Sequence, residues 1–121
     1  NVIALGPVHF KKLKFYIVQS KFCISFMNIK IEGNMIAHHK SLNYLSHGKP
    51  VFGSIFSDYE KLDDIFYMSN NHEVLLKMLS DFISLGESSK LADKRIAYAR
   101  SHTFENILLQ AHKHIKDVRF S

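Results

Sequence analysis

Three consecutive side chains that can carry positive charge, His38, His39 and Lys40, stand where a short helix is expected to begin. The helix would run over residues 39–46 and end at Gly48, a typical C-terminal cap. Free backbone N–H groups already make a helix N-terminus positive, so further cations there are mildly unfavourable. A bound anion removes the conflict, because the N–H groups and a lysine can both hold it. The pattern therefore predicts a phosphate site at residues 38–40.

Other residue types near this helix suit the same ligand. Ser41 can add a hydroxyl to the phosphate, and it is explained equally well as an ordinary helical residue. Asn43 shares a helix face with His39 and Lys40 through three- and four-residue spacings. The two adjacent histidines can also cap the helix, but they are a poor metal pair because neighbouring side chains on a helix diverge. We expect no metal and no cofactor.

The elements around this helix predict a parallel sheet. Apolar runs at residues 2–5, 22–27, 51–52 and 65–68 are expected to be strands, and helical periodicity covers residues 10–19 and 39–46 between them. Asn70 is expected to cap a helix that ends near Gly86, and Thr103 to cap the last of the helices that follow. Alternation of strands and helices predicts an α/β fold, a doubly wound, Rossmann-like parallel sheet with flanking helices over residues 1–121 as one domain. Ligands of such sheets bind where the strands end and the next helices begin.

Composition narrows the class of partner. The chain has 121 residues, is 46% hydrophobic and 22% charged, and carries a net charge of +5. Residues 1–54 hold seven lysines against one acid, a balance of +6, whereas residues 55–121 hold nine basic and ten acidic residues, a balance of −1. An anionic small ligand or an anionic membrane surface explains this asymmetry, and no motif points to nucleic acid. Cys23 is the single cysteine, so a reducing, cytoplasmic compartment is expected.

Residues 40–51, KSLNYLSHGKPV, resemble the K-x-x-E-Y-L-A-x-G-K-P-V-V segment of GT-B-fold glycosyltransferases, the nucleotide-sugar-dependent enzymes that build bacterial surface polysaccharides. Further segments resemble the same family in the same order. They are NVIALGPV at 1–8, FCISF at 22–26, SNNHEVL at 69–75 and RSHTFE at 100–105, where Phe104 replaces the family's tryptophan. The resemblance covers nearly the whole chain.

The resemblance implies the second half of the donor-binding C-terminal domain of such an enzyme, which transfers a hexose from a nucleoside-diphosphate sugar to a saccharide or lipid-linked acceptor. It implies that this portion alone is not a complete enzyme, because the acceptor domain is missing. It also implies peripheral contact with the inner membrane face through the basic half. The alternatives are a non-catalytic interaction module of the same fold and an unrelated flavodoxin-like anion-binding domain.

By the same resemblance, Lys40 neutralises the donor pyrophosphate and Asn43 contacts the donor ribose. The loop residues Glu32, Gly33 and Asn34 lie where the family contacts the donor sugar. One departure concerns a pair of glutamates that the family carries eight residues apart. These fall on Met35 and Asn43 here, and a neutral amide holds a hydroxyl less strongly than a carboxylate.

Overall fold

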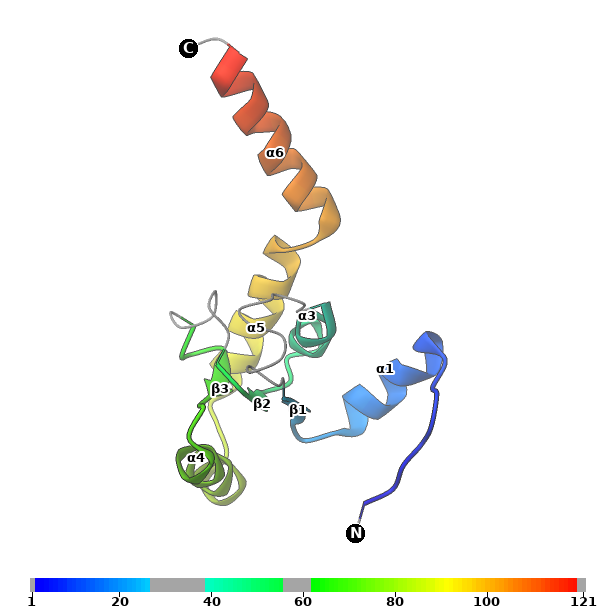
Figure 1. The fold of residues 1–121 in the computed structure, drawn as a ribbon, viewed down its shortest axis with the longest axis vertical. Coiled ribbons are helices and arrows are strands. Elements are labelled where there is room, and N and C mark those ends of the chain that lie inside the picture. The colour runs from blue at the N-terminus through cyan, green and yellow to red at the C-terminus, as the bar shows by residue number, and fades with distance from the viewer. Residues whose placement is uncertain (1, 27–38, 56–61, 120–121) are drawn as a thin grey trace.

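The computed structural model describes residues 2–26, 39–55 and 62–119, and it is a mixed α/β structure (Figure 1). In chain order its elements are α1 (Phe10–Gln19), β1 (Cys23–Ser25), α3 (His39–Ser46), β2 (Val51–Gly53), β3 (Phe66–Met68), α4 (His72–Leu85), α5 (Ser89–Ser101) and α6 (Phe104–Arg119). The helices predicted at residues 10–19 and 39–46 are confirmed at those bounds.

The three strands form one parallel sheet in the order β1-β2-β3. Cys23 lies opposite Val51 in the first pair, and Val51 lies opposite Phe66 in the second. The parallel α/β arrangement predicted from the sequence is confirmed, although β1 is shorter than the run predicted at 22–27. Helices cover both faces, with α3 and α5 on one side and α4 on the other (Figure 1).

The core under α3 and α5 is mostly aliphatic and includes one phenylalanine. Leu45 and Val51 are completely buried, and Phe66 and Ala99 complete the cluster with Ile65. Tyr44 and Cys23 pack against its margin. Tyr44 and Leu45 therefore fix one face of α3 against the sheet.

Aromatic rings hold α4 to the opposite face of the sheet. Phe52 of β2 stacks on Tyr67 of β3 with ring centroids 4.6 Å apart, and it meets Phe82 of α4 edge-on at 5.6 Å. Phe22 adds edge-on contacts to both phenylalanines, at 5.5 Å from Phe52 and 6.1 Å from Phe82. Such edge-to-face pairs stabilise a fold by more than the burial of their surface area alone accounts for.

Specific residues cap the ends of the helices. Gly48 and Gly86 end α3 and α4 with φ of 70°, a left-handed conformation that a residue with a Cβ rarely adopts. The predicted cap at Asn70 is wrong by one residue. Asn71 caps α4, because its Oδ1 accepts from the N–H groups of Glu73 and Val74, whereas Asn70 is used elsewhere. The Thr103 cap of α6 is confirmed by the bond from the Asn106 N–H to its hydroxyl.

Two apolar segments lie outside the core. The strand predicted at residues 2–5 does not form, and Val2 and Ile3 are 99% and 82% exposed. The reason is physical: a strand needs a neighbour for its N–H and C=O groups, and none stands beside this segment among the described residues. Helix α6 extends away from the sheet with an exposed apolar stripe, which includes Phe104, Leu108 and Ile115 (Figure 1).

Candidate functional site

Topology places the N-terminus of α3 at the carboxyl ends of the strands. Since β1 and β2 are parallel and α3 connects them, α3 must run back against the strand direction. Helix α4 follows β3 and begins at the same end of the sheet. This is the end at which sheets of this type bind ligands.

The first turn of α3 presents the Lys40 side chain to solvent. Helix α3 begins at His39, and its first turn contains no acidic residue. Lys40 is exposed, and so is Asn43, which lies three residues further on the same helix surface. Ser41 is only 1% exposed, so its hydroxyl faces the protein interior. Among the described side chains near the start of α3, Lys40 and Asn43 are therefore exposed polar groups and Ser41 is not.

Part of the predicted site lies outside the described residues. This applies to Glu32, Gly33, Asn34 and His38, and to the side chain of His39. The structure thus brings Lys40 and Asn43 together on one helix and leaves the loop contribution as a prediction.

The Asn70 side chain and one backbone bond join the segments that follow β2 and β3. The Oδ1 atom of Asn70 accepts from the Ile55 N–H at 3.0 Å, and the Ser69 N–H donates to the Gly53 carbonyl at 3.1 Å. These bonds hold the segment after β2 against the segment after β3, beside the start of α4. Asn70 was predicted to cap a helix, and its bond to the Ile55 N–H was not predicted.

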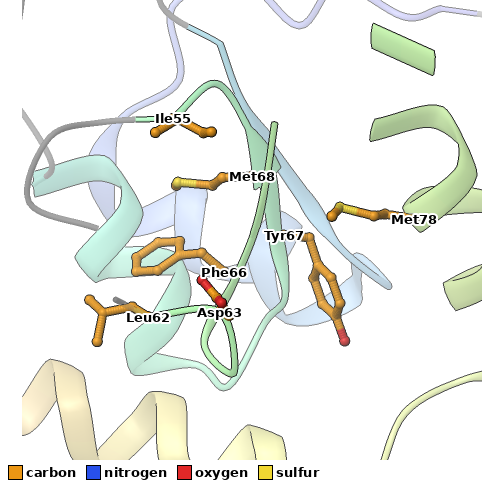
Figure 2. A pocket seen from close by; sticks show the side chains of 7 residues that line it. All are labelled: Ile55, Leu62, Asp63, Phe66, Tyr67, Met68 and Met78. Carbon is orange, nitrogen blue, oxygen red and sulfur yellow. The ribbon is translucent and has the colours of Figure 1, made fainter. Parts of the chain in front are cut away.

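A hollow of about 460 Å³ lies along β3 (Figure 2). Figure 2 shows Phe66, Met68 and Leu62 on one side of the strand, with Tyr67 and Met78 on the other. Ile55 and Asp63 also line it, and Asp63 is the one charged residue among the described lining residues. Neither Lys40 nor Asn43 takes part, so the hollow and the predicted phosphate site are separate features.

A buried ion pair lies beside the end of α3, and the sequence did not predict it. Arg95 of α5 is 0% exposed, and its guanidinium bonds both oxygens of Glu87 at 2.5 and 2.7 Å. The same group donates to the carbonyls of Ile65 and Gly48 at 3.0 and 3.3 Å. Arg95 therefore joins the end of α3, the start of β3 and the segment before α5.

Tyr67 extends this cluster toward the hollow along β3. Its hydroxyl donates to Glu87 Oε2 at 2.9 Å, and the Arg95 guanidinium carbon lies 5.8 Å from its ring centroid. Burial, followed by the hydrogen bond to Glu87 and its charge, raises the pKa of the Tyr67 hydroxyl above its ordinary value. The sequence did carry a signal for Arg95, because it interrupts the apolar helical stripe of Leu91, Ala92 and Ala99.

The contacts of Lys49 and Cys23 indicate structural roles rather than ligand binding or catalysis. The Lys49 Nζ donates to the carbonyls of Val18 and Ser20, both at 2.8 Å, and so caps the carboxyl end of α1. Burial raises the pKa of the Cys23 thiol, while a contact with the Ser20 hydroxyl and the charge of Lys49 lower it less. A thiol of raised pKa stays protonated at neutral pH and is a poor nucleophile.

Within residues 2–26, 39–55 and 62–119, no group of three His, Cys, Asp or Glu side chains is arranged to hold a metal ion. In the same ranges, no helix has the length and apolarity that crossing a bilayer requires. Comparison with known proteins adds no assignment: no protein-family model, no curated protein and no solved structure matches the chain.

Proposed function

We propose that the chain is the nucleotide-sugar-binding portion of a glycosyltransferase that transfers a hexose to a saccharide or lipid-linked acceptor. The observation that carries the proposal is the first turn of α3, which holds an exposed lysine and no acidic residue and stands at the ligand-binding end of a parallel sheet. The ordered resemblance of residues 1–105 to the GT-B enzymes supplies the identity of the anion.

A diphosphate suits the electrostatics of this turn. The first N–H groups of a helix have no partner within it, and together with the positive end of the helix they favour an anion, to which Lys40 adds a full positive charge. During transfer, negative charge develops on the departing nucleoside diphosphate, so the same groups stabilise the transition state more than the ground state. Lys40 is therefore assigned the role of neutralising the leaving group.

Asn43 is assigned to the donor ribose. It is exposed one turn along α3 from Lys40, within reach of a ligand that spans both side chains. Its neutral amide can donate and accept, but it binds a hydroxyl more weakly than a carboxylate does. Ser41 is buried and has no part in this assignment, so the proposal depends on Lys40 and Asn43.

The test is a two-dimensional NMR titration of the chain with UDP, GDP and ADP, compared with the three nucleoside monophosphates. We expect shifts at the amides of residues 39–44 that require the second phosphate and that Lys40→Ala reduces. Lys90→Ala is the matched control, because Lys90 is the second residue of α5 as Lys40 is of α3. Lys90→Ala should leave the shifts unchanged.

Other outcomes identify the alternatives. Binding of inorganic phosphate or of a monophosphate as tightly as a diphosphate would favour an anion-binding domain of another kind. Absence of shifts with every nucleotide, also on a polypeptide that carries an acceptor domain and the opening strands of a donor domain, would favour a non-catalytic interaction module.

A further inference from the structure

The sheet ends at β3 on one side. β3 stands at the opposite end of the strand order from β1, and β2 is its one neighbouring strand among the described residues. Strands that precede β1 in the proposed donor domain would pair beside β1, so they would leave β3 at the edge. The Ser69 N–H donates to the carbonyl of Gly53, which lies opposite Met68. Because a residue in a parallel ladder bonds the neighbours of the residue opposite it, the N–H and C=O of Met68 point away from β2.

The hollow of about 460 Å³ lies around this outer edge. Its lining comes from both faces of β3, with Leu62, Phe66 and Met68 on one and Tyr67 and Met78 on the other (Figure 2). Since β2 occupies the inner edge and the lining follows the strand along its length, the hollow joins the two faces at the outer edge. An occupant therefore meets the peptide groups of Met68 as well as apolar side chains. A purely apolar molecule would leave those peptide groups without hydrogen bonds, whereas an extended peptide would satisfy them.

A second hollow continues the first toward α5. It has a volume of about 500 Å³ and shares Leu62 and Asp63 with the first hollow. Lys94 and Ala97 of α5 also line it. We call the two hollows that meet at Leu62 and Asp63 the β3 groove. Its elongated form suits an extended chain better than a compact small molecule.

Charge in the β3 groove selects the kind of chain. Asp63 lines both hollows and is exposed, and in the described part of the chain it has no ion-pair partner. Asp64 lines the second hollow and is paired with Lys94 at 2.6 Å. The carboxylate of Asp63 is thus available to a cationic side chain. A second copy of the chain would bring a second Asp63 to the same interface, and like charges disfavour such a pairing.

We propose that the β3 groove is a strand-addition site for a basic, apolar segment of a partner polypeptide. The backbone of the segment pairs with Met68, its successive side chains alternate between the two faces of β3, and a lysine or arginine contacts Asp63. The flexible side chains of Met68 and Met78 allow the lining to adapt to the apolar side chains of the segment. The proposal does not depend on the nucleotide site proposed above.

The probe is a synthetic peptide of valine, leucine and threonine with lysine at every third position, about nine residues long to span a typical strand. A comparison peptide has glutamate in place of each lysine. Hydrogen exchange by NMR should show protection of the Met68 amide by the lysine peptide. The glutamate peptide should bind about tenfold more weakly at physiological salt, where charges more than about 8 Å away are largely screened. Because the whole chain carries a net charge of +5, non-specific attraction would give the opposite preference.

An acid-to-amide change tests the charge selection. Asp63→Asn should remove most of the preference for the lysine peptide. Asp81→Asn is the matched control, because Asp81 is an exposed acid of α4 that lines neither hollow, and it should leave the preference unchanged.

Two further variants isolate backbone pairing. Met68→Pro removes the outward N–H and leaves the Ser69 bond to β2 in place, so it should abolish binding, whereas Met68→Leu should preserve it. If Met68→Pro does not fold, the unmodified chain is tested with a lysine peptide N-methylated at every amide, which has no backbone N–H to donate and should not bind. Equal or tighter binding of the glutamate peptide, binding of the N-methylated peptide, or no protection of the Met68 amide would overturn the proposal. So would a dimer of the chain alone that Met68→Pro dissociates.

Discussion

Replacing Arg95 by alanine removes one side chain and disturbs three parts of the fold. The Glu87 carboxylate, whose side chain is only 16% exposed, loses its counter-charge. The carbonyls of Ile65 and Gly48 lose a donor at the same time. Buried acceptors without donors and a buried charge without a partner both favour the unfolded state, in which water satisfies them.

The expected loss in the free energy of unfolding is about 3–5 kcal/mol, the cost of removing one partner of a buried ion pair. Domains have only about 5–15 kcal/mol of stability in total. The many exposed apolar side chains of this chain place it toward the lower end of that range. The urea midpoint of Arg95→Ala should therefore fall by about half or more, since the midpoint scales with the free energy of unfolding.

Urea unfolding followed by circular dichroism measures this loss. Arg100→Ala is the matched control, because Arg100 lies in the last turn of the same helix and is exposed, and it should change stability by no more than about 0.5 kcal/mol. The double variant Arg95→Met with Glu87→Leu should cost less than the two single changes together, since it leaves no unpaired buried charge. If Arg95→Ala matches Arg100→Ala, or if the two single costs simply add, the reasoning is refuted.

Three further outcomes are expected. Gly53→Ala should destabilise the chain strongly, because the added Cβ would lie 2.0 Å from a backbone carbonyl oxygen of β1. Gly6→Ala is the control: its Cβ would meet no atom within 4 Å, so it should cost only backbone strain of about 1 kcal/mol. Parallel urea titrations measure both. Asn71→Ala should cost about 1 kcal/mol in the same assay through the lost cap of α4, and a neutral result would contradict the capping role. The pKa of Tyr67 is raised in the folded protein, so the neutral hydroxyl stabilises the fold at pH values below its ordinary pKa. This stabilisation is lost as the pH rises through the folded-state pKa. Absorbance titration of Tyr67→Phe should lack one late-ionising tyrosine, and an unchanged late step would count against the assignment.

Local signals predicted local structure well. Helical spacing and glycine caps gave α3 and the end of α4, and apolar runs gave the cores of β1, β2 and β3. The strand predicted at residues 2–5 is wrong because a strand depends on a neighbour, which periodicity within one segment cannot reveal. The cap at Asn71 differs from the prediction at Asn70 because Asn70 bonds Ile55, fifteen residues away in sequence.

The candidate site was predictable only where one helix carries it. Lys40 and Asn43 are close because helical geometry makes them so, and this needs no knowledge of the tertiary fold. The exclusion of Ser41 from the surface depends on what packs over α3, which the spacing of residues does not show. The role of Arg95 depends on partners at 65 and 48, which are 30 and 47 residues distant, and an arginine in an apolar stripe was its one local sign.

The bonds of Arg95 also constrain the order in which the chain can fold during synthesis. The ribosome releases α3, β2 and β3 before residue 95 emerges from its exit tunnel. Until then the carbonyls of Gly48 and Ile65 lack this donor, and the apolar face of α3 lacks the α5 helix that packs on it. A nascent chain that carries only the sheet would expose strand edges and apolar surface, the features that chaperones recognise and that promote aggregation. Stable folding of the sheet is therefore expected to wait for α5.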